Sequence, residues 1–199
     1  MISRKISMKV LLYGGAFNPP TIDHQKILNS LIREADKVGN CEVWLFPSGE
    51  NNKKKTGIAK SRRLKYLKAL INSVDSRNIT VRIERLDLDT TFPEPDKSLT
   101  MRRLQAKYPK VDFVLVYGAD SIATIDTWGG KWLEENFDIF VFPRGGIKIK
   151  LFPRMKMMDI KTANISSTLV RERIRNHEKY TDLIPIGVAK TIKEADYQK

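Results

Sequence analysis

The sequence predicts an α/β protein whose mostly parallel sheet is covered by helices on both faces. Short apolar runs alternate along the chain with longer segments of helical periodicity, as in consecutive β-α-β units. The run at 9–13 ends in Gly14 and Gly15, and the run at 111–117 ends in Gly118. Because ligands bind beyond the carboxyl ends of parallel strands, we expect the motifs after these runs to share one crevice.

The apolar runs predict strands, in order, at 9–13, 42–46, 79–83, 111–117, 138–142 and 157–160. Pro47 stops the second strand, and Pro143 follows the fifth. Proline suits both places because it cannot donate a hydrogen bond within a ladder.

Helical periodicity predicts helices at about 22–37, from Ser61 onward, and at 100–107, 168–176 and 182–195. We expect Ser61 to cap its helix, because a serine oxygen accepts from the unpaired N–H groups of a first turn. The spacing of apolar residues puts one buried face on the first helix, formed by Ile27, Leu28, Leu31, Ile32 and Ala35.

Length and composition predict one globular domain over residues 1–199, with 1–7 as an N-terminal extension. Hydrophobic residues make up 41% of the chain and charged residues 30%. No apolar run approaches the length needed to span a membrane, and the first residues lack the apolar core of a signal peptide. The single cysteine, Cys41, excludes an internal disulfide. We therefore expect a cytoplasmic protein.

The net charge of +13 indicates anionic partners of one of two kinds. One is a nucleic acid, since basic patches follow phosphate backbones. The other is a small polyphosphate drawn to a basic surface. Lysine and arginine are spread along the whole chain apart from the run 53–55, which a solvated charge run explains equally well. This distribution favours the small polyphosphate and predicts no specific nucleic acid. The oligomeric state stays open, and a homo-oligomer is one alternative.

The segment 13–24 predicts a strand, a tight turn and the start of a helix. Glycine at 14 and 15 permits a sharp turn and a close approach of backbone to a ligand. A helix that begins at Thr21 offers unpaired N–H groups and a partial positive charge, which bind phosphate. His24 lies in the first turn, where its imidazole can face the same anion. The alternative is an ordinary turn with a surface histidine.

A second phosphate-binding pattern occupies 165–171. Ser166, Ser167 and Thr168 combine hydroxyl groups with the free N–H groups of a helix start, and Arg171 follows one turn later. The arginine side chain suits phosphate oxygens because it presents two parallel donors. The alternative is a plain helix cap followed by a surface arginine.

A third pattern follows the strand at 111–117. Asp120 comes just after the strand end and can hold a ribose or a ligand amide, and Trp128 lies eight residues further on. An exposed indole stacks on planar rings, whereas the usual role of tryptophan is core packing. The neighbouring Thr127, Gly129 and Gly130 favour a loop over a core helix.

The first two patterns resemble the paired signatures of the nucleotidyltransferase superfamily. Gly14-Gly15-Ala16-Phe17-Asn18-Pro19 and Thr21-Ile22-Asp23-His24 resemble its phosphate-binding signature, and Ile165-Ser166-Ser167-Thr168-Leu169-Val170-Arg171 resembles its C-terminal one. Asp23 stands where the superfamily usually has glycine. Asn18 stands where its closest subfamily often has aspartate.

Further blocks resemble the nicotinate-mononucleotide adenylyltransferase family, and the resemblance covers nearly the whole chain. They are Gly118-Ala119-Asp120 with Trp128, Pro47-Ser48 with Lys54, Arg63-Leu64, Ser98-Leu99-Thr100 and Phe142-Pro143-Arg144. The sequence departs from the family in the loop that usually reads Pro-Pro-His-Lys and here reads Asn51-Asn52-Lys53-Lys54. It departs again at Leu99 and Arg103, where tyrosine and threonine are usual.

The resemblance implies a Rossmann-like nucleotidyltransferase fold and an enzyme that joins ATP to nicotinate mononucleotide with release of pyrophosphate. It assigns the catalytic roles to His24, Thr21 and Arg171. It implies ATP binding by Gly14, Gly15, Ala16, Phe17, Ser166, Ser167, Thr168 and Lys54. It implies mononucleotide binding by Asn18, Thr100, Gly118, Asp120, Trp128 and Arg144. Mg²⁺ is expected as a cofactor held by phosphate oxygens, with no protein side chain as its ligand.

Two alternatives remain at this stage. The enzyme could be a related adenylyl- or cytidylyltransferase with another acceptor, such as nicotinamide mononucleotide, because phosphate motifs do not specify the acceptor. The chain could also be a nucleic-acid-binding regulatory protein on the same fold. The intact Ser-Ser-Thr-x-x-Arg block argues against that second alternative.

Overall fold

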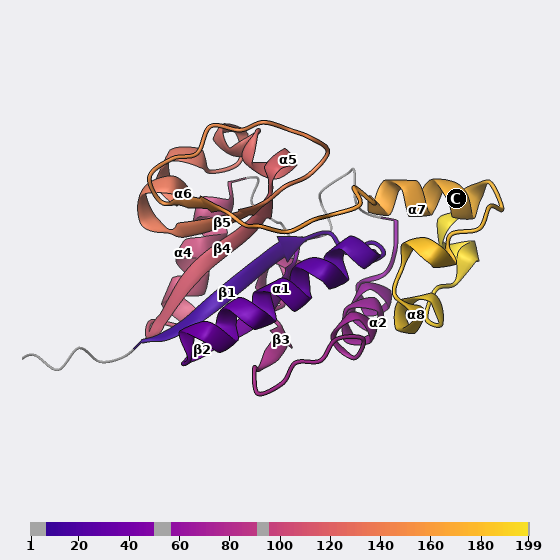
Figure 1. Cartoon of the computed structure of the whole chain (residues 1–199), viewed down its shortest axis with the longest axis horizontal. Helices are drawn as coiled ribbons and strands as arrows, with labels where there is room; N and C mark the ends of the chain where they lie inside the picture. The colour runs from indigo at the N-terminus through magenta and orange to yellow at the C-terminus, as the bar shows by residue number, and fades with distance from the viewer. Residues whose placement is uncertain (1–6, 50–56, 91–95, 199) are drawn as a thin grey trace, which may run out of the picture.

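A computed structural model describes residues 7–49, 57–90 and 96–198. Its centre is a sheet of six parallel strands in the order β3-β2-β1-β4-β5-β6 (Figure 1). The strands are β1 (Met8–Gly15), β2 (Cys41–Pro47), β3 (Val81–Ile83), β4 (Val111–Gly118), β5 (Asp138–Phe142) and β6 (Met155–Met157). The predicted α/β class with a parallel sheet is confirmed.

In the described parts of the chain, one or more α-helices separate successive strands as far as β5, and β6 follows β5 without a helix between them. The α-helices are α1 (Ile22–Val38), α2 (Lys60–Ile71), α3 (Leu86–Asp89), α4 (Lys97–Lys107), α5 (Ala119–Ile122), α6 (Gly130–Asn136), α7 (Ser167–Arg175) and α8 (Ile186–Ala189). Short 3₁₀ helices are η1 (Ile125–Thr127), η2 (Thr181–Leu183) and η3 (Glu194–Tyr197). None of the helices described combines the length and apolar character needed to cross a bilayer.

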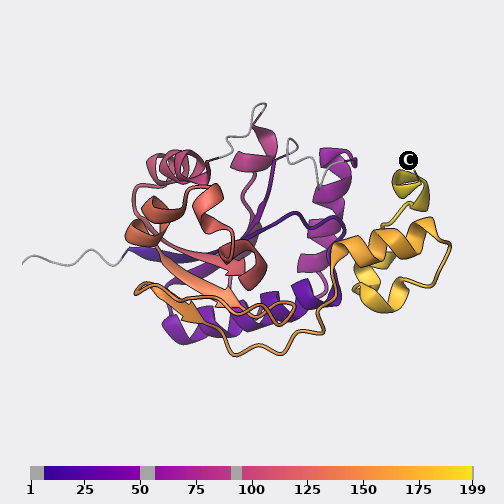
Figure 2. The same ribbon diagram turned by 90° about the horizontal axis from the view of Figure 1, so that it is seen from above.

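Alternation along β1 divides the core into two layers. Leu11 and Tyr13 pack with Leu28 of α1 on one face, and Val10 and Leu12 pack with Leu104 of α4 on the other. Successive residues of a strand point to opposite faces, so one strand serves both layers. Figure 2 shows the sheet between α1 and α4. The predicted helices on both faces are therefore present.

Strand order places a ligand crevice beside β1. The chain runs from β1 outward to β2 and β3, and then returns to place β4 on the other side of β1. The point at which the order reverses is where ligands bind in open parallel sheets. The loop after β1 and the helix after β4 both start there.

Three expected elements differ in the structure. The helix predicted at 182–195 is broken into η2, α8 and η3, because Ile184 precedes Pro185 and is extended at φ −132°, ψ 152°. The second helix begins at Lys60 with Ala59 as its N-cap, so Ser61 does not cap it. The last strand lies at Met155–Met157, two residues before the predicted start, because its pairing with 139–141 sets the register.

The C-terminal elements form a third apolar cluster against α2. Val170 and Ile174 of α7, Leu183, and Tyr197 near the C-terminus pack with Tyr66 of α2. In Figures 1 and 2 this orange and yellow part lies beyond α2, at the end of the molecule away from β5 and β6. Packing against α2 thus carries α7 back toward the loop after β1.

Arg63 joins three segments at the carboxyl edge of the sheet. Its side chain is only 1% exposed. The guanidinium donates to the Ala16 carbonyl from Nε (3.1 Å) and Nη2 (2.9 Å), and from Nη2 to the Ser48 carbonyl (2.7 Å). Arg63 therefore ties α2 to the loops that follow β1 and β2.

We expect Arg63→Met to lower the free energy of unfolding by about 3 kcal/mol. The methionine fills similar space but leaves two buried carbonyl groups without their charged donor. Urea unfolding at neutral pH measures the change. Lys65→Met on the exposed side of the same helix is the control and should change stability by less than about 0.5 kcal/mol. Equal stability of the two variants would contradict this role for Arg63.

Candidate active site

Tight packing explains both glycines of the first motif. A Cβ on Gly14 would lie 2.6 Å from Cε1 of Tyr117, and one on Gly15 would lie 3.0 Å from Cζ of Phe17. The absence of a side chain at each glycine therefore leaves room for the Tyr117 ring of β4 and for the Phe17 ring of the loop itself. Phe17 itself is fully buried and has a left-handed backbone (φ 49°). The loop is therefore packed closely against β4 and its own Phe17 ring.

His24 and Thr21 form a reciprocal cap at the start of α1. The Thr21 backbone N–H donates to Nδ1 of His24 (3.0 Å), and the His24 backbone N–H donates to Oγ1 of Thr21 (3.4 Å). His24 is 8% exposed, which excludes the alternative of a surface histidine. Because Nδ1 accepts a backbone N–H, the neutral ring carries its proton on Nε2.

Burial keeps this imidazole neutral. Desolvation, with a smaller effect from the Arg144 guanidinium, lowers the pKa of His24 to about 3. His24 is thus a neutral N–H donor over the physiological range in the ligand-free protein.

The second motif meets the first directly, although the two are about 150 residues apart in the chain. Ser166 caps α7 by accepting from the Leu169 N–H (3.1 Å). Ser167 Oγ donates to the Pro19 carbonyl (2.8 Å), and Arg171 Nη1 donates to the Asn18 carbonyl (2.7 Å). Arg171 Nη2 also donates to Oγ1 of Thr168 (3.0 Å). Arg171 therefore faces the loop and is not a surface arginine.

Three of the residues predicted around the mononucleotide, Gly118, Asp120 and Arg144, lie at the ends of β4 and β5. Asp120, in α5, pairs with Arg144 after β5 (Nε–Oδ2 3.2 Å). A Cβ on Gly118 would collide with the Asp120 carboxylate and with the Phe142 ring. The absence of a side chain at Gly118 thus lets Asp120 fold back over the strand end.

Trp128 is partly buried in the layer of α4 and α6. Its ring meets Tyr117 edge to face with the centroids 5.1 Å apart, and its Nε1 donates to the Ser121 carbonyl (3.2 Å). The Trp128 carbonyl accepts from the Lys97 N–H at the start of α4 (2.9 Å). Thr100 is buried in this helix, one turn beyond Lys97. Lys54 lies outside the described residues.

Sequence reasoning missed the contribution of the C-terminus. Tyr197 is buried, and its hydroxyl donates to Oδ1 of Asn18 (3.1 Å) and lies 3.4 Å from the Tyr66 hydroxyl. No local pattern at the end of the chain marks this tyrosine, since the contact depends on how the third cluster folds back. Asn18, which we expected at the mononucleotide, is held by Tyr197 through its side chain and by Arg171 through its carbonyl.

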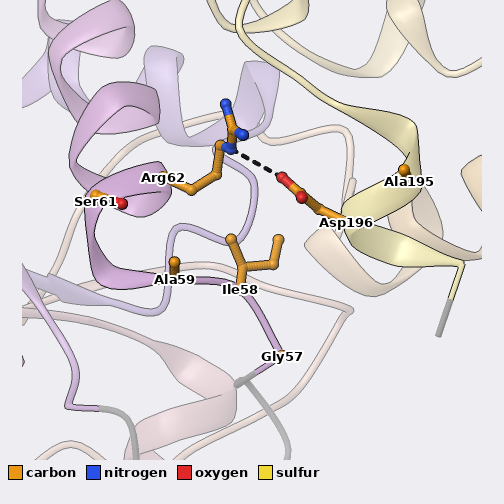
Figure 3. A pocket seen from close by; sticks show the side chains of 7 residues that line it. All are labelled: Gly57, Ile58, Ala59, Ser61, Arg62, Ala195 and Asp196. Atoms are coloured by element: carbon orange, nitrogen blue, oxygen red, sulfur yellow. Dashed lines mark ion pairs between the residues drawn. The ribbon is translucent and has the colours of Figure 1, made fainter.

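A separate pocket of about 260 Å³ lies between the start of α2 and the C-terminal segment (Figure 3). The Arg62–Asp196 ion pair crosses it (2.8 Å). None of the predicted site residues that the structure describes lines it. Asp196 precedes Tyr197, so the ion pair helps to anchor the segment that reaches Asn18. The lining residues are Gly57, Ile58, Ala59, Ser61, Arg62, Ala195 and Asp196.

The site's donors suit an anion. Around the two motifs lie hydroxyl groups, an imidazole N–H and a guanidinium, together with the N-termini of two helices. Over the described residues, no group of three histidine, cysteine, aspartate or glutamate side chains is placed to hold a metal ion. Such a donor set suits a polyphosphate that carries its own cation.

The buried neutral His24 predicts a loss of stability in acid. Its pKa is about 3 in the folded protein and about 6.5 when unfolded, so the unfolded chain binds the extra proton between these values. Stability from His24 is therefore complete above pH 6.5 and falls toward pH 3. We expect wild type to lose about 2 kcal/mol more than His24→Gln between pH 7.5 and pH 5. Urea unfolding at both values measures this, and identical pH dependence of the two proteins would contradict it.

Comparisons with known proteins agree with this geometry. The cytidylyltransferase-like family model matches residues 12–173. A probable nicotinate-nucleotide adenylyltransferase of Flavobacterium johnsoniae is 27% identical, over 96% of this chain and all of that one. The protein of the same description from Halalkalibacterium halodurans is 30% identical, over 96% of this chain and 91% of that one.

A solved structure has the same fold. It is that of Plasmodium falciparum nicotinic acid mononucleotide adenylyltransferase complexed with NaAD, and it superposes with a TM-score of 0.77 at 22% identity over 95% of this chain and 97% of that one. With both signatures joined at the end of β1 and the matches spanning nearly the whole chain, this protein belongs to the cytidylyltransferase-like family and, within it, to the nicotinate-nucleotide adenylyltransferases.

Proposed function

We propose that this protein transfers AMP from ATP to nicotinate mononucleotide, forming the deamido-dinucleotide and pyrophosphate for NAD biosynthesis. The description of its relatives supports this reaction. The observation that carries it is the junction of the two phosphate motifs, in which Ser167 and Arg171 of α7 bind the loop after β1. Two helix N-termini then face one polyphosphate.

The chemistry is displacement at phosphorus. A phosphate oxygen of the mononucleotide attacks the α-phosphorus of ATP, a new P–O bond forms, and the bond to the bridging oxygen of the β-phosphate breaks. The electron pair leaves with pyrophosphate. Because the attacking phosphate is already ionised at neutral pH, the reaction needs no base, and catalysis consists of positioning and charge stabilisation.

His24 and Thr21 act at the α-phosphate in this proposal. The cap fixes the imidazole with the proton on Nε2, which is then the donor to the phosphate oxygen on which charge develops. The start of α7 holds the β- and γ-phosphates through Ser166, Ser167 and Thr168, with further N–H groups of Arg171. Gly14, Gly15, Ala16 and Phe17 provide the backbone beside the triphosphate, and Lys54, outside the described residues, remains a predicted ATP-binding residue. Mg²⁺ accompanies ATP on the phosphate oxygens and neutralises charge.

The mononucleotide site combines charge and a ring surface. We assign Asp120 to the ribose, Arg144 to an acidic group of the acceptor, and Trp128 to the pyridine ring. Gly118, Asn18 and Thr100 complete the site. The residues assigned to the two sites run from Gly14 to Arg171, which supports a single domain over 1–199. The proposed place of action is the cytoplasm. The basic charge of the chain then serves small phosphates, with no specific nucleic acid as partner.

The proposed catalytic roles predict that single substitutions of His24 or Arg171 lower kcat strongly. We expect His24→Ala to lower kcat about 10²–10³-fold while remaining folded, because one donor to the developing charge is removed. Arg171→Lys should also lose activity, because an ammonium cannot give two parallel contacts. Steady-state kinetics with melting curves measure both.

Each catalytic variant has a matched control in the chain. His177→Asn changes the other histidine, which is exposed and left-handed (φ 56°), a conformation that asparagine accepts. Arg173→Lys changes an arginine of the same helix that contacts the Lys179 carbonyl. Both controls should keep wild-type kcat. A folded His24→Ala protein with wild-type kcat would remove the catalytic role.

Acceptor recognition predicts two further outcomes. We expect kcat/KM for nicotinate mononucleotide to exceed that for nicotinamide mononucleotide about tenfold, because a carboxylate makes charge-assisted hydrogen bonds. Trp128→Ala should raise the acceptor KM about five- to a hundredfold, the usual effect of losing a stacking partner, and leave the ATP KM within about twofold.

Trp132→Ala is the control for Trp128, since it removes another partly buried indole from the same layer. It should leave the acceptor KM near the wild-type value. Equal use of the two mononucleotides would contradict the proposed acceptor. An unchanged acceptor KM in Trp128→Ala would contradict the role of Trp128 alone.

A further inference from the structure

Asp23 is a buried carboxylate in the first turn of α1, next to His24. Its side chain is 3% exposed. Oδ1 accepts from the Ala163 N–H (2.9 Å) and Oδ2 from the Ile165 N–H (2.8 Å). Both oxygens are therefore bound by the segment that leads into α7, and a glycine at this position would leave these two N–H groups without that partner.

The segment it binds is a tight turn. Asn164, between the two donors, has a left-handed backbone (φ 58°), which directs both neighbouring N–H groups to one carboxylate. The Asn164 side chain accepts from the Gly145 N–H (2.7 Å). Gly145 follows Arg144, which pairs with Asp120. A chain of contacts thus runs from the proposed mononucleotide site through the turn to Asp23.

The same turn sets the position of α7. The Ile165 N–H binds Asp23, and the Ile165 carbonyl lies 3.3 Å from Oγ1 of Thr21, which donates its one proton to Nδ1 of His24 (2.7 Å). The next residue, Ser166, is the N-cap of α7. Asp23 therefore holds the residue immediately before α7 and positions the first turn of α7 relative to the first turn of α1.

We propose that Asp23 is a positioning residue for ATP, which aligns Ser167, Thr168 and Arg171 with His24 around the triphosphate. The inference rests on the proposed assignment of α7 to the β- and γ-phosphates. Asp23 acts through the turn at 163–165 and does not itself contact the phosphates.

Removing the charge of Asp23 has two opposite effects on ATP affinity. A carboxylate near a triphosphate repels it, so its loss would strengthen ATP binding if simple Coulomb repulsion dominated. Loss of the two charge-assisted hydrogen bonds frees the turn, so α7 no longer has one position and ATP binding weakens. Both oxygens of Asp23 already accept from backbone N–H groups, which offsets much of the repulsion. We therefore expect positioning to dominate.

The test is ATP and pyrophosphate binding by calorimetry, with steady-state kinetics beside it. Asp23→Asn keeps the size of the side chain but places an amide N–H against a backbone N–H. We expect it to weaken ATP and pyrophosphate binding about tenfold and to raise the ATP KM similarly, with the acceptor KM within about twofold. Asp23→Gly, which restores the residue usual in the superfamily, should weaken binding at least as much, because no other group of this chain then holds the two N–H groups.

Glu84→Gln is the matched control. Glu84 is 4% exposed and accepts from the Leu86 N–H (3.0 Å), Lys107 and Tyr108 at the β3 edge. The Glu84→Gln variant should have a lower Tm than wild type, as Asp23→Asn should, but it should bind ATP with wild-type affinity.

Two results would overturn the inference: unchanged or tighter ATP binding in folded Asp23→Asn, or an equal rise in both KM values. If wild type does not use nicotinate mononucleotide, the proposed reaction is wrong. The comparison of ATP binding between wild type and the Asp23 variants still tests the role of Asp23, because ATP binding needs no acceptor.

Discussion

The structure depends on holding two helix N-termini at one point. The N-termini of α1 and α7 carry like partial positive charges, which the Asp23 carboxylate in the first turn of α1 offsets. Hydrogen bonds across about 150 residues of sequence hold the two first turns together. Ser167 and Arg171 bind carbonyl groups of the loop after β1, and Asp23 binds the segment before α7. The anion site is thereby organised before its ligand arrives.

Four carbonyl groups at the end of β1 and in the loop that follows accept hydrogen bonds from other parts of the protein. Gly15 accepts from the Ser48 N–H, Ala16 from Arg63, Asn18 from Arg171, and Pro19 from Ser167. Unpaired carbonyl dipoles beside a triphosphate would repel it. Arg63 and Arg171 therefore make contacts within the protein. Their positive charges also favour a phosphate group nearby, because the dielectric constant is low there.

Periodicity predicted most of the fold, and motif spacing predicted which loops and helix starts lie together at the end of β1. The strand at 111–117 and the helix at 22–37 are strongly patterned, and both lie within two residues of the predicted bounds. The prediction of one helix at 182–195 was wrong because Pro185 disfavours a helical Ile184, which is extended and packs into the third cluster. Short elements such as α3 and α5 were missed because four residues hold too little pattern.

The sequence by itself determined the layers and the kinds of donor at the candidate site, because strand alternation, helix starts and the donor types of His24, Ser167 and Arg171 are local properties. Tertiary structure decided how these donors are used. The neutral state of His24 comes from burial under neighbouring elements, and the contact of Tyr197 with Asn18 comes from the C-terminus folding back on α2. Asp23 shows the difference most clearly: in sequence it is a departure from a glycine, and only the folded chain brings Ala163 and Ile165 to its two oxygens. No local sequence pattern predicts a contact between Asp23 and residues about 140 positions away, because the contact forms only when the sheet between them has folded.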